Sequence, residues 1–96
     1  MEKEKYFVHD FSIELLQRPD NPKYSDIHLS ITTETSKNFN YEIHADERHP
    51  SLEQLNEILF TKLNLAKEKK SEIGIYDYPE RFYLFIDDLQ MSAHKK

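Results

Sequence analysis

The spacing of the apolar residues changes along this chain, and the change limits the folds that it can adopt. Apolar and polar residues alternate over 27–33 and again over 39–45, a period-two pattern typical of half-buried strands. Over 52–69 the apolar residues instead recur every three or four positions, which indicates a helix with one apolar face. Two shorter apolar segments follow, 73–76 and 81–86, and each has the length of a strand. The chain is therefore predicted to contain strands, one helix, and strands again.

The N-terminal segment supplies one more alternating run before these. Phe7, Phe11, Ile13 and Leu15 occupy every second position, apart from residue 9, so we expect them on one face of a first strand. Residues 18–22 contain two prolines and an Asp-Asn pair, which should end that strand.

The runs 27–33 and 39–45 are separated by a short polar segment and predict a β-hairpin. With residues 34–38 as its loop, Thr33 would lie opposite Phe39 on the inner face. On the outer face of the same register, His28 would lie opposite His44.

The predicted helix carries signals at both ends. Ser51 followed by Gln54 matches a capping box, in which each side chain satisfies a free backbone N–H. Glutamates near the start and lysines near the end complement the helix dipole. The apolar face is expected to consist of Leu52, Leu55, Ile58, Leu59, Leu63 and Ala66, with Leu65 at its edge.

A fold class follows from this order of elements. We expect one α+β domain over residues 1–96, a mainly antiparallel sheet of four or five strands with one long helix on one face. The expected order is strand, strand, strand, helix, strand, strand. The terminal segments 1–5 and 92–96 are expected to be flexible.

Composition excludes several classes of protein. The net charge is -5. There is no cysteine, so a disulfide framework and thiolate metal sites are ruled out. No segment has the ~20 apolar residues of a membrane span, and residues 1–5 lack the apolar core of a signal peptide. We therefore expect a cytoplasmic protein that does not enter a membrane.

Candidate chemistry is sparse. Three histidines, His28, His44 and His49, lie near carboxylates, but their spacing matches no established ligand motif. Asp87 and Asp88 are adjacent, so on a continuing strand they would point to opposite faces and could not act as a facing pair. We predict no catalytic residues, no metal and no cofactor. A metal site or minor enzyme at these histidines is a third hypothesis, after the two that are given below.

Aromatic residues near the C-terminus could stack nucleobases. Tyr76, Tyr78, Tyr83 and Phe85 form the possible platform. Segment 71–91 nevertheless holds five acids and only one arginine, whereas nucleic-acid affinity depends on positive charge. Direct nucleic-acid binding is therefore not expected.

Acids interleaved with tyrosines indicate a surface that binds a protein instead. Tyrosine offers contact area and a hydrogen bond at low entropic cost, and carboxylates would attract a basic partner. The residues expected to bind a partner are Tyr76, Asp77, Tyr78, Glu80, Asp87, Asp88, Glu42, Asp46 and Glu47.

The leading hypothesis is a non-enzymatic inhibitor or antagonist that covers a basic, nucleic-acid-binding surface of another protein. In size, charge and lack of cysteine the chain resembles the small acidic inhibitors of phages and bacterial mobile elements, including anti-CRISPR and immunity proteins. Ten lysines, eight isoleucines and three arginines also hint at an AT-rich coding genome. The resemblance rests on no motif and implies no site residues. The alternative is a small regulatory domain that binds a ligand or forms a homodimer by pairing edge strands.

Overall fold

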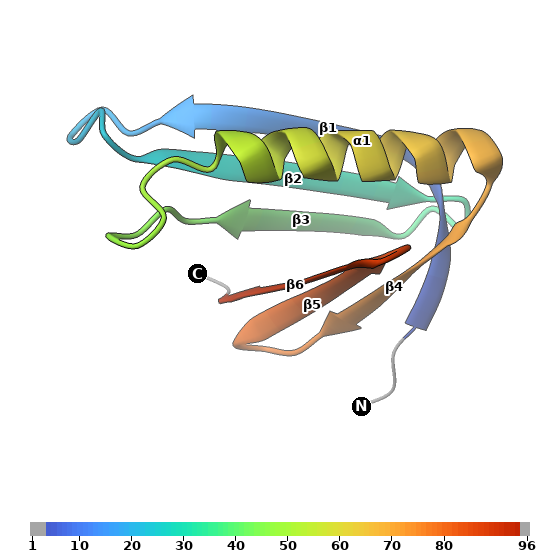
Figure 1. The fold of residues 1–96 in the computed structure, drawn as a ribbon. Helices are drawn as coiled ribbons and strands as arrows, with labels where there is room; N and C mark the ends of the chain where they lie inside the picture. The colour runs from blue at the N-terminus through green and yellow to red at the C-terminus, as the bar shows by residue number, and fades with distance from the viewer. Residues whose placement is uncertain (1–3, 95–96) are drawn as a thin grey trace.

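The computed structural model describes residues 4–94 as one sheet and one helix. The strands and the helix are β1 (Glu4–Gln17), β2 (Ser25–Thr33), β3 (Asn38–Ile43), α1 (Glu53–Lys69), β4 (Glu72–Asp77), β5 (Arg81–Ile86) and β6 (Leu89–His94). The six strands are antiparallel and lie in the order β3-β2-β1-β4-β5-β6 (Figure 1). This confirms the predicted α+β class and adds a sixth strand to the four or five expected.

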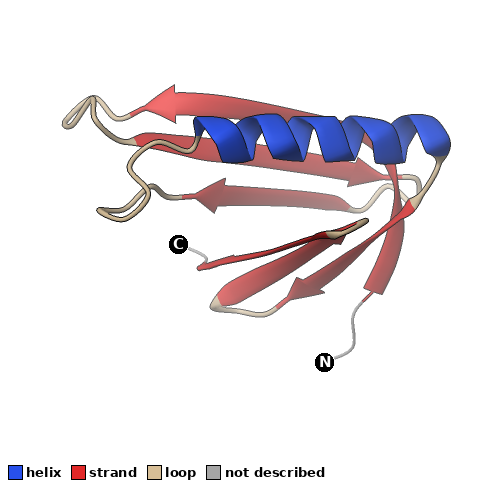
Figure 2. Ribbon diagram, viewed as in Figure 1, coloured by secondary structure: helices blue, strands red, loops and turns tan. Residues whose placement is uncertain are grey.

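The long strand β1 belongs to both halves of the sheet. Its first residues, Glu4 to Phe7, pair with β4, and the remainder, from Val8 onward, pairs with β2. Figure 2 shows the resulting arrangement: β1, β2 and β3 form one group, β4, β5 and β6 turn away from it, and α1 runs along the first group. β1 therefore connects the two halves of a folded sheet.

The core lies between the two halves of the sheet and beneath α1. Leu59, Leu63 and Ala66 are the buried residues of α1, and this helix contacts mainly β1 and, to a smaller extent, β5. The sheet contributes Val8, Ile27, Leu29, Ile31, Thr33, Phe39, Tyr41, Ile43, Ile73, Ile75, Phe82, Leu84 and Ile86. The predicted inner faces of β2 and β3 are thus confirmed.

A bulge corrects the predicted face of β1. Val8 pairs with Thr33, but Asp10 pairs with Thr32, so the register shifts at His9. The extra residue reverses the alternation. Phe7 consequently points outward and is 42% exposed, while Val8 is buried.

The β2–β3 hairpin has a shorter loop than predicted, and this shifts its register by two residues. The Thr33 N–H donates to the Lys37 carbonyl at 2.9 Å, and Ser36 has a left-handed φ of 67°. These features close a three-residue loop rather than one of five. Phe39 therefore lies opposite Ile31 instead of Thr33, and His28 lies opposite Glu42 instead of His44.

The helix itself is confirmed, but its predicted cap is not. Leu52 is the N-cap residue and no side chain caps the helix, because α1 begins where an apolar residue stands at the capping position. Glu53 in the first turn and Lys67 and Lys69 in the last confirm the predicted charge order. Ile58, expected in the core, is 45% exposed.

Both predicted flexible ends are partly strand. Residues 4–5 belong to β1 and pair with β4, and residues 92–94 belong to β6 and pair with β5. Residues 1–3 and 95–96, also expected to be flexible, lie outside the described residues.

Candidate functional site

Four aromatic side chains meet on the outer side of β4 and β5, and we call this cluster the aromatic face. Its residues are Tyr76, Tyr78, Tyr83 and Phe85. Alternation along β5 buries Phe82, Leu84 and Ile86 and turns the residues between them outward. The register sets Tyr76 directly opposite Tyr83, so the rings come together as cross-strand neighbours.

The rings hold one another in edge-to-face contacts. Tyr76 lies 6.2 Å from Tyr83 and 5.7 Å from Phe85, at interplanar angles of 83° and 85°. Tyr78 lies 5.9 Å from Tyr83 at 86°. Such geometry is preferred because the positive ring edge meets the negative ring face. All four side chains are only half-buried, so the cluster is ordered and still accessible.

A surface hollow of about 780 Å³ lies over this face. Gly74 stands opposite Phe85 in the ladder and is buried. Polar groups border the rings, with Glu80, Arg81, Gln90 and His94 lining the hollow. The Arg81 guanidinium lies 2.7 Å from His94 Nε2. Because arginine can only donate, His94 accepts through this nitrogen.

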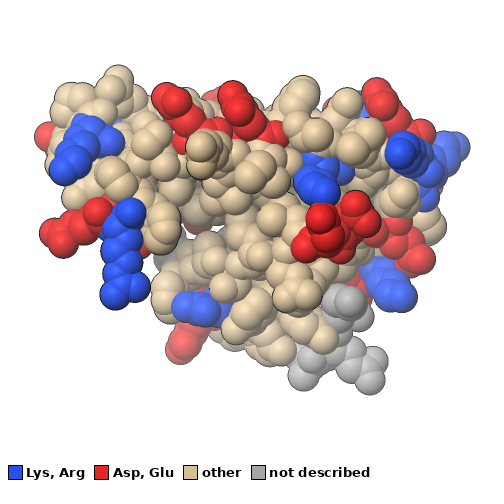
Figure 3. All heavy atoms as spheres, in the orientation of Figure 1, with Lys and Arg blue, Asp and Glu red and all other residues tan. Residues whose placement is uncertain are grey.

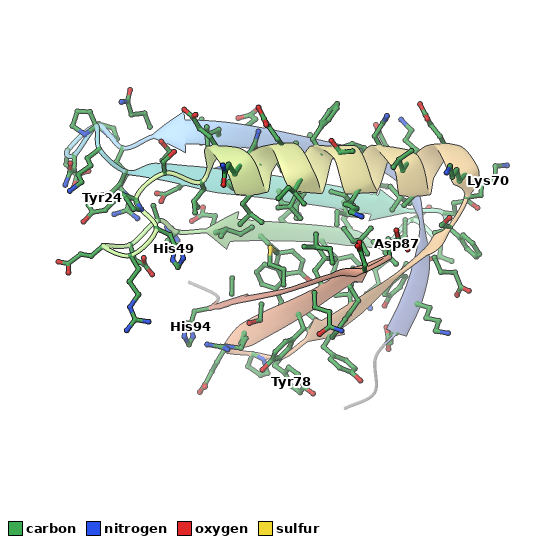
Figure 4. The ribbon with its side chains drawn as sticks, viewed as in Figure 1. Tyr24, His49, Lys70, Tyr78, Asp87 and His94 are labelled. Carbon is green, nitrogen blue, oxygen red and sulfur yellow. The ribbon has the colours of Figure 1, made fainter. Side chains whose placement is uncertain are left out.

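The aromatic face contains two of the residues predicted to bind a partner, and a third lies next to it. Tyr76 and Tyr78 form part of it, and Glu80 lies on the turn beside it. Figure 4 shows Tyr78 on the side of the molecule away from α1. Asp77 alternates with these tyrosines and lies on the other side of the strand, near Tyr41, although it is itself exposed. Burial raises the pKa of Tyr41, and the Asp77 carboxylate raises it further.

Asp87 and Asp88 form the two-residue turn between β5 and β6, away from the aromatic face. Asp87 has a φ of 56°, the left-handed conformation that such turns require. Lys62 of α1 contacts both carboxylates, at 3.6 Å and 2.5 Å. The ammonium lowers the pKa of Asp88. These acids thus join the β5–β6 hairpin to α1. The sequence did not predict their contact with Lys62.

Glu42 lies on the outer face of β3 between two histidines. Its two carboxylate oxygens are each 3.4 Å from a ring nitrogen, one from His28 and one from His44. His44 also lies 3.5 Å from Asp26. The sequence predicted that the two histidines would be close, and the structure places a glutamate between them.

Asp46 and Glu47 lie in the loop before α1. The Asp46 carboxylate accepts the backbone N–H groups of Arg48 and His49, at 2.9 Å and 2.8 Å. The His49 N–H lowers the pKa of Asp46 most strongly. Asp46 therefore shapes its own loop, while Glu47 is exposed.

A clip at the base of this loop has no counterpart in the sequence predictions. Arg18 donates to both oxygens of Asp26, at 2.9 Å and 2.8 Å, and to the Ala45 carbonyl at 2.8 Å. The Ala45 N–H donates to Asp26 at 2.9 Å. The Arg18 guanidinium holds the pKa of Asp26 far below its usual range. The clip joins the ends of β1, β2 and β3.

A groove of about 700 Å³ lies between α1 and β6. Its walls include apolar side chains from α1 and β6 together with three histidines: Leu52, Leu55, Ile58, Ala93, His44, His49 and His94. Among residues 4–94, no group of three or more His, Asp or Glu side chains is placed to hold a metal ion. In the same part of the chain, α1 lacks the length and apolar character needed to cross a membrane.

Comparison with known proteins finds no family model, curated protein or solved structure that matches this chain.

Proposed function

We propose that this protein is a non-enzymatic protein-binding module and that the aromatic face is its contact surface. The observation that supports this most is the set of four half-buried rings on the solvent side of β4 and β5. A cluster of aromatic residues rimmed by polar groups is characteristic of interaction surfaces. Rings that already support one another lose little further freedom on binding.

The partner that suits this surface has an apolar centre and a basic rim. Glu80 lies beside the rings, and the protein carries a net charge of -5. A negative field increases the rate of encounter with a positive partner. If the surface thus covered is one that binds nucleic acid, the protein acts as an antagonist in the cytoplasm, as small acidic inhibitors do.

An affinity experiment tests this proposal. The tagged protein is used to capture partners from cells of its own source at low and high salt, beside a Tyr76→Ser, Tyr83→Ser double variant. The expected result is one stoichiometric protein whose affinity falls roughly thirtyfold or more in the variant, as loss of a tyrosine hot spot implies. Binding should also weaken as salt rises.

The matched control is Phe60→Ser. Phe60 is 51% exposed on α1 and contacts Phe11, so it is an accessible ring outside the aromatic face. Equal capture by the double variant and the wild type would remove the aromatic face from the interface. Equal loss in the Phe60 variant would show only a general sensitivity to lost aromatic area.

The groove between α1 and β6 favours a second candidate function, the binding of a small regulatory ligand. Its volume of about 700 Å³ is within the ~300–1,000 Å³ typical of ligand pockets. Leu55 and Ile58 supply apolar surface and His49 supplies a polar contact. A metabolite library screened by thermal shift distinguishes the two functions, because binding in this groove should survive high salt and the loss of Tyr76 and Tyr83.

A further inference from the structure

The edge strand β6 lacks the features that normally prevent strands from pairing with other molecules. Within residues 4–94 it pairs only with β5, and its six residues, LQMSAH, include no Lys, Arg, Asp, Glu or Pro. Natural edge strands usually carry charges, prolines or bulges for protection. The other edge strand, β3, does contain a glutamate, Glu42.

The turn before β6 determines which backbone groups are available. Ile86 and Leu89 flank the two-residue turn, and such a pair exchanges hydrogen bonds in an antiparallel ladder. The N–H and C=O groups of Leu89 and of every second residue after it therefore point toward β5. Those of Gln90, Ser92 and His94 point to the free side.

Apolar surface on α1 lies beside this edge. Lys62 contacts the β5–β6 turn, so the helical stripe that includes Lys62 faces the hairpin. Residues four before and three after it share that stripe. These are Ile58 and Leu65, which are 45% and 41% exposed. A strand added to β6 would cover part of this surface.

Charges of opposite sign occupy the two ends of the hairpin. Asp87 and Asp88 lie at the turn and are 83% and 81% exposed. Arg81 faces His94 at the other end, and its guanidinium supplies the positive charge there. Figure 4 shows Asp87 and His94 at opposite ends of β6, and Figure 3 shows mainly uncharged atoms over the middle of this region, below the helix. A second hairpin placed antiparallel would bring acidic end to basic end twice.

We propose that a second copy of this chain pairs with β6, antiparallel and about a twofold axis at Met91. Directly opposed residues in an antiparallel pair share a face, which limits the possible registers. With Met91 on the axis, Leu89 lies opposite the second copy's Ala93, and Asp88 lies opposite its His94. Gln90 and Ser92, which have free backbone groups, exchange hydrogen bonds across the axis. The neighbouring register, with Ser92 on the axis, separates Asp88 from His94.

Such a dimer extends the sheet through β6 of both copies. The outward side chains of both copies then lie on one side of the continuous sheet, which places two aromatic faces on the same surface. The pairing does not depend on the proposed function. It would nevertheless make the module bivalent, and bivalent binding raises apparent affinity without any new contact.

Cysteine cross-linking tests the pairing, because the chain contains no cysteine of its own. Met91→Cys places two thiols across the axis at a non-hydrogen-bonded pair, with Cα atoms ~4.5 Å apart, within the range for a disulfide. Ser92→Cys is the matched control, since its two Cα atoms would be roughly 8 Å apart. Mild oxidation should give a covalent dimer with Met91→Cys and far less with Ser92→Cys.

Analytical ultracentrifugation of the wild type supplies an independent readout that requires no variant. The expected result is a monomer–dimer equilibrium that Asp88→Lys shifts toward monomer. A monomer at every concentration would overturn the proposal, as would a dimer in which neither cysteine cross-links. Preferential cross-linking through Ser92→Cys would overturn the proposed axis.

Discussion

Tyr41 of β3 and Phe82 of β5 stack face to face, with ring centroids 3.8 Å apart and an interplanar angle of 8°. The two residues belong to opposite halves of the sheet, which are joined through β1. The rings are 6% and 0% exposed, so the stack lies inside the fold. It is a direct ring contact between the two halves of the folded sheet.

Loss of the Phe82 ring should therefore destabilise the whole domain. We expect Phe82→Ala to lower the free energy of unfolding by ~3–5 kcal/mol, the usual cost of removing a buried aromatic ring. The neighbouring Tyr83 points outward and is half-buried, so Tyr83→Ala should cost far less. Chemical denaturation of both variants measures the difference. Similar losses in the two would mean that the assigned faces of β5 are wrong.

The Arg18–Asp26 clip should make stability depend on acidity. Folding lowers the pKa of Asp26, mainly through the Arg18 side chain. The ionised Asp26 therefore stabilises the fold at pH values above the ordinary carboxyl pKa of about 3.9. This contribution decreases as the pH falls from that value toward the folded pKa. At pH 7, Asp26→Asn should cost roughly 1–3 kcal/mol, as for other hydrogen bonds to a charged group.

Urea denaturation at a series of pH values tests the clip. The stability difference between wild type and Asp26→Asn should be greatest near neutral pH and become smaller below about pH 4. Glu47→Gln is the control, because Glu47 is an exposed acid next to the same loop. A difference that stays constant into acid would mean that ionisation of Asp26 contributes nothing.

The sequence pattern predicted the strands and the helix well where the spacing of buried apolar residues was sufficient. The alternation in β2 and β3 and the stripe through Leu59 and Leu63 depend on burial alone, and burial imposes a period directly. The bulge at His9 was missed because one inserted residue reverses the alternation without a local signal. The register of the hairpin depended on its loop length, which Ser36 sets by adopting a left-handed conformation.

The candidate site was predictable only in part, for a similar reason. The four rings of the aromatic face were grouped from the sequence as a possible stacking platform, because they lie close together along the chain, but only Tyr76 and Tyr78 were predicted to bind a partner. Asp77 alternates with Tyr76 and Tyr78, so a strand must turn it to the other face. β6 was missed because its inward residues, Leu89, Met91 and Ala93, form only a weak apolar pattern. They follow two aspartates, which were expected to end the last strand. Long-range contacts such as Lys62 with Asp88 leave no trace in local sequence.

The apolar stripe of α1 predicts a contrast between two adjacent residues. Leu59 is 0% exposed, whereas Ile58 is 45% exposed. Leu59→Ala should cost ~2–5 kcal/mol of stability because it leaves a cavity in the core. Ile58→Ala should cost clearly less in the same thermal or urea measurement. The reverse order would show that the helix is rotated from the position described.

The end of α1 predicts two adjacent substitutions with opposite effects. Lys70 has a left-handed φ of 55°, and its N–H bonds to the Ala66 carbonyl, a position that favours glycine. Lys70→Gly should stabilise the protein by roughly 1 kcal/mol through relief of that conformation. Lys69→Gly, inside the helix, should destabilise it by about 1 kcal/mol. Melting temperatures that move in the same direction for both variants would contradict the assigned end of the helix.

Glu80 in the β4–β5 turn and Asp77 at the end of β4 should differ in their effect on partner binding. Glu80 lines the hollow over the aromatic face, whereas Asp77 lies on the other side of the strand, near Tyr41. Glu80→Lys should therefore weaken capture of a basic partner by about tenfold at low salt, chiefly by slowing association. The loss should shrink at high salt, where exposed charges are screened. Surface plasmon resonance at two ionic strengths measures both rates.

Asp77→Lys is the control for this prediction. Its effect should appear in folding stability, through the surroundings of Tyr41, more than in the association rate. If Asp77→Lys slowed association as much as Glu80→Lys while the fold stayed intact, the contact surface would have to include the other side of β4 at Asp77. The aromatic face alone would then be too small to describe the interface.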